Sequence, residues 1–160
     1  MIQIVPFSPQ YADGAVSVIL PIQQAEFDIP ITLDAQPDLT NIPAFYQRAD
    51  GNFWVALDGG KVVGTVALLD IGNHQAALRK MFVAATHRGP AYGVARQLFS
   101  TLIAWCRAKD VTAVYLGTTA KFLAAHRFYE KSGFREIARG ALPDTFPVMA
   151  VDTKFYTLPL

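Results

Sequence analysis

The sequence predicts one globular domain of α/β (α+β) class over residues 1–160. Strand-like and helix-like stretches alternate along the whole chain, with no low-complexity segment and no internal repeat. Of the 160 residues, 52% are apolar and 17% are charged, which supplies a substantial core and excludes a disordered chain. The predicted strands and helices follow the order β-α-α-β-β-β-α-β-α-β-β.

The first part of the chain predicts a strand and then a helix. The strand covers residues 2–7. Ser8 and Pro9 form an N-cap and first-turn pair, and an apolar stripe at helical spacing predicts a helix that ends near Pro21. Residues 21–43 are rich in proline and acidic residues, so short helical pieces and loops are expected there.

Three strands are predicted next, at residues 51–57, 61–71 and 75–83. Asp58-Gly59-Gly60 separates the first two and is a strong hairpin signal. Gly72-Asn73-His74 forms a short turn before the third. The first two segments therefore predict a hairpin, and the third predicts a further strand after it.

Residues 93–108 have helical periodicity. Val94, Leu98, Leu102 and Trp105 lie on one helical face, with further apolar residues beside them. This pattern predicts a helix that is buried over a wide face.

The remaining elements are predicted as strands at 111–117, 134–138 and 149–157 and a helix at 120–132. Thr118 or Thr119 would cap the start of this helix, and Gly133 supplies the left-handed residue that ends it.

Charge is nearly balanced overall but unevenly distributed. The net charge of +1 gives no reason to expect nucleic-acid or membrane partners. Residues 1–75 hold two bases and eight acids, a net −6, whereas residues 76–160 hold twelve bases and five acids, a net +7. One half could face a cation and the other an anion. With no signal-like N-terminus and no apolar run near the roughly 18 residues of a membrane span, a cytoplasmic protein is expected.

Cysteine and histidine usage argues against disulfides and metal. Cys106 is the only cysteine, which excludes an intrachain disulfide and a cysteine-rich zinc site. The histidines His74, His87 and His126 lack metal-ligand spacing, so no metal is expected. His74 is expected in a turn and His126 on an exposed helix face.

Several motif searches are negative. The chain has no dinucleotide-binding glycine motif after a strand, no Walker-type loop and no serine-hydrolase elbow. What remains is a strand that passes through a short glycine-containing loop into a helix, with Arg88 and Arg96 on either side. Free N–H groups at a helix start and two cations predict an anion site, most naturally for phosphate. Two solvated arginines on an ordinary connection remain the alternative.

One family is recognisable in this part of the chain. The run from Ala125 to Phe134 reads Ala-His-Arg-Phe-Tyr-Glu-Lys-Ser-Gly-Phe and resembles the Ala-x-x-Phe-Tyr-Glu-x-x-Gly-Phe motif of the GNAT superfamily of N-acetyltransferases. Gly93-Val94-Ala95 matches the end of the family's Arg/Gln-x-x-Gly-x-Gly/Ala loop. The Arg/Gln position falls on Pro90, and Arg88-Gly89 stands two residues earlier, as in a longer loop. The resemblance extends over residues 78–137.

The resemblance implies a fold and a cosubstrate. The fold would be a single domain with a mixed, mostly antiparallel sheet of about seven strands, helices on both faces, and a splay between strands four and five. The cosubstrate would be acetyl-CoA, with no metal. Backbone groups of the strand end would pair with the pantetheine arm, and the following loop and helix start would hold the diphosphate. The residues implied in cosubstrate binding are Met81, Phe82, Val83, Arg88, Gly89, Tyr92, Gly93, Val94, Ala95 and Arg96.

Catalytic residues are only partly implied. Tyr129 stands where relatives hold the tyrosine that protonates the departing thiolate, whereas Phe122 replaces an asparagine that is frequent in the family. The glutamate that many relatives carry near 76–78 is absent. A general base could come from Glu26, Asp28, Asp34 or Asp38, or from a water chain.

The resulting hypothesis is an N-acetyltransferase that moves the acetyl group to a primary amine of a small molecule or peptide by direct attack. Glu26, Phe27 and Asp28 are the candidate acceptor-binding residues. The acidic first half predicts positively charged acceptors. The alternative is a non-catalytic acyl-CoA-binding sensor or partner-binding module. A homodimer is common in such folds, and Phe155 and Tyr156 could belong to the core or to an interface.

Overall fold

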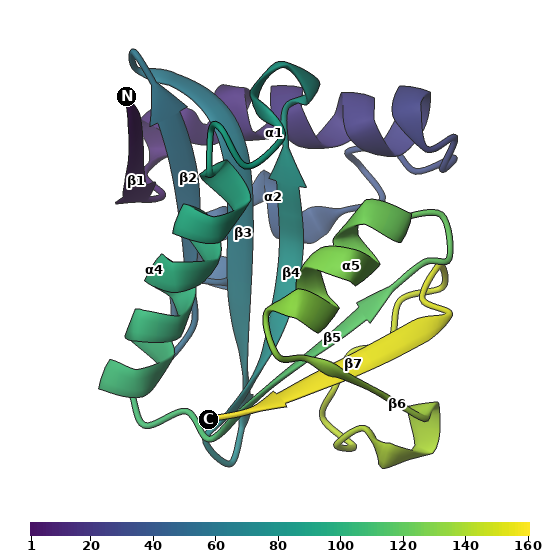
Figure 1. Cartoon of the computed structure of the whole chain (residues 1–160). Helices are drawn as coiled ribbons and strands as arrows, with labels where there is room; N and C mark the ends of the chain where they lie inside the picture. The colour runs from purple at the N-terminus through teal and green to yellow at the C-terminus, as the bar shows by residue number, and fades with distance from the viewer.

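The structure, a computed structural model, describes residues 1–160 and contains one sheet of seven strands in the order β1-β2-β3-β4-β5-β7-β6 (Figure 1). β4 and β5 are parallel, and every other neighbouring pair is antiparallel. The predicted mixed, mostly antiparallel sheet is confirmed. The strands are β1 (Ile2–Pro6), β2 (Asn52–Asp58), β3 (Lys61–Gly72), β4 (Gln75–Val83), β5 (Ala113–Thr118), β6 (Arg135–Ile137) and β7 (Lys154–Pro159).

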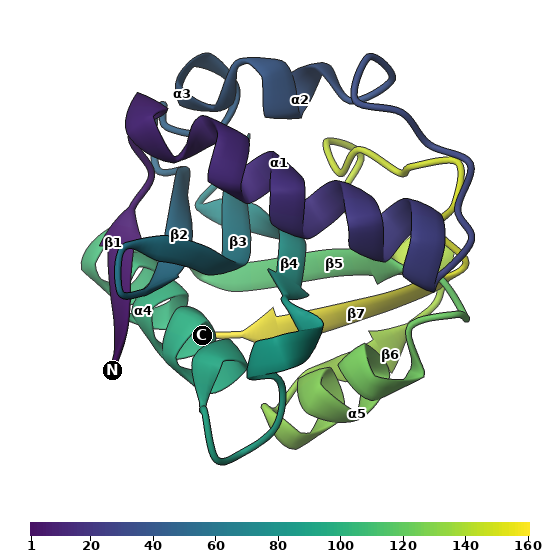
Figure 2. The same cartoon turned by 90° about the horizontal axis from the view of Figure 1, so that it is seen from above.

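Helices cover both faces of the sheet, as predicted. Figure 2 shows α1, α2 and α3 on one face and α4 and α5 on the other. The helices are α1 (Ala12–Pro21), α2 (Pro37–Thr40), α3 (Ile42–Phe45), α4 (Val94–Ala108) and α5 (Leu123–Lys131). None of them is both long and apolar enough to cross a membrane.

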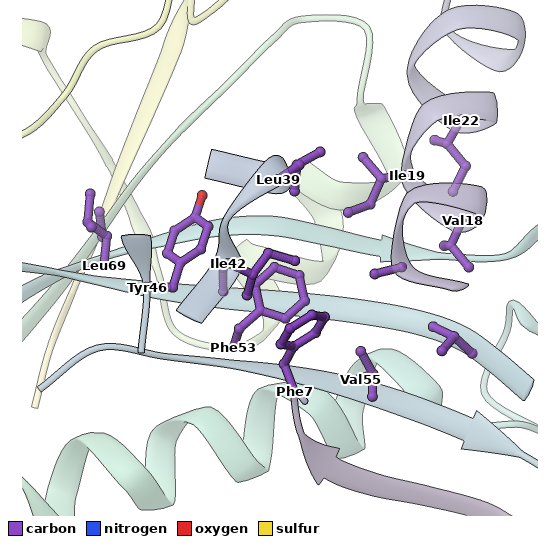
Figure 3. Close-up of a cluster of buried hydrophobic side chains, with 14 of the residues drawn as sticks. Phe7, Val18, Ile19, Ile22, Leu39, Ile42, Tyr46, Phe53, Val55 and Leu69 are labelled. Atoms are coloured by element: carbon purple, nitrogen blue, oxygen red, sulfur yellow. The ribbon is translucent and has the colours of Figure 1, made fainter. Parts of the chain in front are cut away.

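The sheet separates two hydrophobic cores. Alternate residues of β2 point to opposite faces, so Phe53 and Val55 pack under α1 to α3, whereas Trp54 and Ala56 pack under α4. Figure 3 shows Phe53 and Val55 in the first core, on the side of the sheet covered by Ile19. Because both faces of β2 are buried, its sequence is a continuous apolar run rather than an alternating one.

β4 and β5 pair only at one end. Residues 75–77 of β4 pair with residues 113–115 of β5, and beyond these the strands diverge (Figure 1). The predicted splay is confirmed. The edge of β4 from Leu78 to Val83 has no strand partner on this side.

A β-bulge interrupts β4 at Lys80. Phe82 pairs with Thr65 and Arg79 pairs with Ala67, so two residues of β4 oppose one residue of β3. Lys80 has φ +52°, a left-handed conformation that is uncommon outside glycine, and its carbonyl accepts a hydrogen bond from Thr65 Oγ1 at 2.7 Å. The extra residue puts the neighbouring side chains of Arg79 and Lys80 on the same face of the sheet, where each lies within 4 Å of Asp38.

The first helix continues past its predicted end. Ser8 makes no side-chain cap, Pro21 lies inside the helix, and a π-helical turn extends the chain to Glu26. Proline has no N–H for the helical ladder, and a wider turn, closed by a hydrogen bond from Phe27 N–H to Ile22 C=O at 3.0 Å, keeps the backbone helical. The prediction that the helix ends near Pro21 was therefore wrong.

α5 begins at Leu123, later than predicted, and neither Thr118 nor Thr119 caps it. The carbonyl of Thr119 instead closes a separate turn, accepting from the Phe122 N–H at 3.1 Å, and is also 2.9 Å from His126 Nε2. His126 is consequently buried, not exposed as predicted.

β7 begins at Lys154, not at Met149 as predicted, because residues 149–152 form a turn. The Asp152 carboxylate accepts a hydrogen bond from the Met149 N–H at 2.9 Å and closes this turn. Phe155 and Tyr156 are both buried in the cores of the chain.

Candidate active site

A cavity of about 540 Å³ opens where β4 and β5 diverge. Its lining comes from the segment after α1, the end of β4 and the loop after it, the first turn of α4, β5, α5 and the segment before β7. The residues predicted to bind the cosubstrate that line it are Met81, Phe82, Val83, Arg88, Gly89 and Ala95. Tyr129, the predicted general acid, lines the same cavity.

The start of α4 presents free backbone donors. Gly93 has φ +64° at the N-cap, and no side chain caps the helix. The first helical hydrogen bond runs from the Gln97 N–H to the Gly93 carbonyl at 3.0 Å, so the N–H groups of residues 94–96 have no partner within the helix. Together with the positive end of the helix dipole they form an anion site beside the cavity.

Arg88 is engaged by the chain itself. Its Nε donates to the Val83 carbonyl at 2.9 Å, its Nη2 donates to Glu26 Oε2 at 2.9 Å, and its Nη1 contacts Glu26 Oε1. The pair ties the segment after α1 to the loop after β4. A diphosphate that approached Arg88 would compete with the Glu26 carboxylate.

Tyr129 lines the cavity, and its hydroxyl makes no hydrogen bond within the chain. The residue is buried and its ring packs against Phe134 and Tyr156, with centroids 5.6 and 6.1 Å away. The hydroxyl has no hydrogen-bond partner in the chain, yet every fully buried side-chain polar atom has one, so this oxygen is reached from the cavity. Burial raises the pKa of Tyr129 above its ordinary value of 10.0, so the phenol keeps its proton at neutral pH.

A charged cluster that the sequence analysis did not identify lies at the bulge of β4. Asp38 is buried, accepts a hydrogen bond from the Tyr46 hydroxyl at 2.6 Å, and lies 3.8 Å from Arg79 Nη2 and 3.6 Å from Lys80 Nζ. Lys80 Nζ also donates to Gln36 Oε1 at 2.6 Å. Arg79 and Lys80 line the cavity, whereas Asp38 lies behind them. Burial lowers the pKa of Lys80.

Asp152 is the other ionisable residue at this part of the cavity. Its carboxylate lies over the backbone of Gly117 in β5, where a Cβ would be 2.5 Å from Asp152 Oδ2. Only a glycine at position 117 leaves this space. Burial raises the pKa of Asp152, an effect opposed by the Met149 N–H and by the positive charges of Arg79 and Lys80.

Comparison with known proteins identifies the family. The profile of the acetyltransferase (GNAT) family matches residues 19–134, most of the chain. The chain belongs to the GNAT acetyltransferase family.

Relatives of known sequence and structure agree with this assignment. An N-acetylaspartate synthetase from Danio rerio is 36% identical over 124 residues, which cover 76% of this chain and 39% of that protein. The chain thus spans about two fifths of this relative's length. A GNAT-family acetyltransferase from Staphylococcus aureus Mu50 has 39% identity and a TM-score of 0.95, with 99% of each chain covered. The PaiA N-acetyltransferase of Thermoplasma acidophilum, crystallised with coenzyme A, shares the fold with a TM-score of 0.76 and 13% identity over 100% and 99% of the chains.

Not every residue predicted to bind the cosubstrate lines the cavity. Val94 is buried in the core, where its Cγ1 would lie 2.9 Å from a Cβ at Gly64. Tyr92 is 47% exposed and its ring lies 5.1 Å from that of His87. Gly93 and Arg96 lie at the helix start, outside the cavity lining.

Of the three candidate acceptor-binding residues in the N-terminal segment, one lines the cavity and two do not. Phe27 lines the cavity and packs edge-on against Phe122, with ring centroids 4.6 Å apart, and Phe82 lies 6.1 Å from Phe122. Phe122 therefore makes an aromatic wall where many relatives have a polar asparagine. Glu26 and Asp28 are exposed and outside the cavity lining.

The candidate bases of the N-terminal segment do not line the cavity either. Glu26 pairs with Arg88, Asp38 is bonded to Tyr46, and Asp34 is outside the lining. Asp152 is the carboxylate that does line the cavity. A turn of four residues before the last strand positions it, and no sequence motif pointed to that turn.

Proposed function

We propose that residues 1–160 form one acetyltransferase domain that moves the acetyl group of acetyl-CoA to a primary amine of a small molecule by direct attack. The observation that carries the proposal is the Tyr129 hydroxyl, which opens without a partner into the cavity between β4 and β5. A buried phenol without a partner in its own chain is suited to a substrate atom that needs a proton.

Acetyl-CoA fits the elements that surround the cavity. The free edge of β4 offers backbone groups to the amide-containing pantetheine arm, as an added strand would use them. The N–H groups at the start of α4 suit the diphosphate. The relatives named N-acetylaspartate synthetase make a small-molecule amine the first acceptor class to test, ahead of a peptide.

The reaction needs one proton donor and one proton acceptor. The amine nitrogen attacks the thioester carbonyl carbon, the C–N bond forms, and the C–S bond breaks. Tyr129 donates its hydroxyl proton to the departing sulfur, the nitrogen releases one proton to water in the cavity, and Tyr129 recovers a proton from water. Reference pKa values of about 10 for tyrosine and about 8.5 for a thiol make full transfer uphill by about 2 kcal/mol. A hydrogen bond that shortens as the C–S bond breaks avoids most of that cost.

The test measures cosubstrate binding and turnover separately. Calorimetry with acetyl-CoA alone should detect binding, and a panel of primary amines should release CoA thiol and give an acetylated product by mass spectrometry. Absence of binding at millimolar acetyl-CoA would contradict the cosubstrate. Binding without turnover on any amine would favour the non-catalytic sensor instead.

A further inference from the structure

The guanidinium of Arg79 is nearly buried and poorly satisfied. Its side chain is 12% exposed and stacks over the rings of Phe45 and Tyr46, 5.6 and 5.7 Å from their centroids. It makes no hydrogen bond to oxygen, because its polar contacts are the Met149 sulfur at 3.5 Å and Asp38 at 3.8 Å. Arginine has five N–H donors in a planar fork that matches a carboxylate, and Arg79 lines the cavity.

Lys80 reaches the same face only through the bulge. In a regular strand its side chain would point into the opposite core, away from Arg79. The left-handed backbone at Lys80, φ +52°, is uncommon for a residue other than glycine. The result is two adjacent cations on one wall of the cavity, which is the arrangement that an anionic group of a substrate needs.

Asp152 supplies the opposite charge at this part of the cavity. Its Oδ2 accepts the Met149 N–H, while its Oδ1 has no hydrogen-bond partner. It belongs to the turn before β7 and lies over Gly117 of β5, which leaves the space for its carboxylate. A free carboxylate oxygen in a cavity is suited to an ammonium or amine group.

We infer that Arg79 and Lys80 bind a carboxylate of the acceptor and that Asp152 binds its amino group, so that the acceptor is an amino acid. This inference rests on the proposed function and names its acceptor class. Arg79, Lys80, Asp38 and Asp152 together are two cations and two carboxylates, and a zwitterion adds no net charge to this set. A polyamine would add positive charge beside two buried cations without a carboxylate to balance it.

The inference replaces the expectation from charge distribution. The acidic N-terminal half predicts cationic acceptors, but two of its carboxylates are paired with cations of the chain itself. Asp38 faces Arg79 and Lys80, and Glu26 pairs with Arg88. Asp38 and Glu26 are therefore not free to attract a cationic acceptor.

The first arm of the test compares acceptors that differ only in the carboxylate. Each α-amino acid in a panel is paired with its carboxamide, which keeps the amino group and side chain. A lost charge-assisted hydrogen bond costs about 1.5–3 kcal/mol, so KM should be roughly 10- to 150-fold higher for the amide of the best amino acid. Equal KM values, or a preference for diamines, would overturn the inference while leaving acetyl transfer intact.

The second arm removes the proposed carboxylate ligand. Arg79→Gln should lower kcat/KM for the amino acid by about 10- to 150-fold and barely change it for the amide, so that the preference disappears. Arg107→Gln is the matched control, since this arginine is exposed in the last turn of α4. Arg79→Lys keeps the positive charge but not the planar guanidinium. Its kcat/KM for the amino acid should lie between the values of the unchanged protein and Arg79→Gln. An unchanged acid-to-amide ratio in Arg79→Gln would refute the assignment.

A binding measurement separates the two proposals. The acetyl-CoA affinity of Arg79→Gln should equal that of the unchanged protein, which shows that the variant is folded. Calorimetry of the CoA-bound protein with the amino acid should show binding that Arg79→Gln abolishes. Amino-acid binding that depends on Arg79 but gives no turnover would support the carboxylate site and contradict the proposed acetyl transfer. Turnover without a preference for the carboxylate would support acetyl transfer and contradict the carboxylate site.

Discussion

Tyr129→Phe is the most direct test of the chemistry that the cavity supports. The substitution keeps the aromatic ring and removes one oxygen. The ring contacts with Phe134, Phe128 and Tyr156, at centroid distances of 5.6, 6.0 and 6.1 Å, are retained. The hydroxyl has no partner within the chain, so its removal breaks no intramolecular hydrogen bond.

The magnitudes follow from that environment. The free energy of unfolding should change by no more than about 0.5 kcal/mol, since neither packing nor a hydrogen bond is lost. If Tyr129 protonates the leaving sulfur, kcat should fall by about 10²- to 10⁴-fold, the scale of a lost general acid. Burial raises the pKa of Tyr129, so the unchanged protein should show no loss of kcat from ionisation of this phenol below about pH 10.

The assay is CoA thiol release at saturating acetyl-CoA and acceptor, with a single-turnover measurement that shows whether the chemical step limits the rate. Tyr11→Phe is the matched control, because Tyr11 is also partly buried, makes no side-chain hydrogen bond and lies outside the cavity. Nearly unchanged turnover in Tyr129→Phe, with chemistry rate-limiting, would refute the acid role and leave Tyr129 as a packing residue.

Three further predictions concern the cosubstrate site and the core. Gly93→Val should abolish acetyl-CoA binding measured by calorimetry, because a side chain would occupy the space beside the anion site. It should also cost about 1–2 kcal/mol of stability, because φ at this position is +64°. Gly140→Ala, where a Cβ meets open space, should change neither the acetyl-CoA affinity nor the thermal unfolding temperature. Glu26→Gln releases Arg88 from an exposed ion pair worth about 0.2–1 kcal/mol, so calorimetry should show acetyl-CoA binding up to about fivefold more tightly. Weaker binding would show that the ion pair instead helps to form the site. Burial raises the pKa of the Cys106 thiol to about 12. A thiol reagent at pH 8 should therefore leave the native protein unlabelled and label one site after denaturation. Rapid labelling of the native protein would contradict this burial.

Much of the fold was accessible from sequence because its signals are local. The Asp58-Gly59-Gly60 turn specified a hairpin, and the apolar stripe of residues 93–108 specified a buried helix. The errors lie at element ends, where tertiary contacts compete with local preference. Thr119 illustrates this, since its hydroxyl accepts only from the Lys121 N–H, at 3.4 Å, and does not cap α5. Its carbonyl accepts from the Phe122 N–H and contacts the buried His126.

The residues of the candidate site also differ in whether a local sequence signal indicates them. The motif around Tyr129 and the glycines of the loop after β4 could be predicted because the chemistry and the backbone conformation reside in consecutive residues. Asp152 could not, because its place over Gly117 depends on the pairing of β5 with β7, which are far apart in the chain.

The sequence by itself determined the order of the elements, the family and the identity of the proposed proton donor, since each depends on short-range periodicity or on a contiguous motif. The tertiary structure alone decided which charged side chains meet at the proposed acceptor site. A bulge at Lys80 turns neighbouring cations to one face, and the packing of residues 36–38 against β4 brings Asp38 to them. Both arise from strand register and layer packing, where the free energy depends on residues that are distant in sequence.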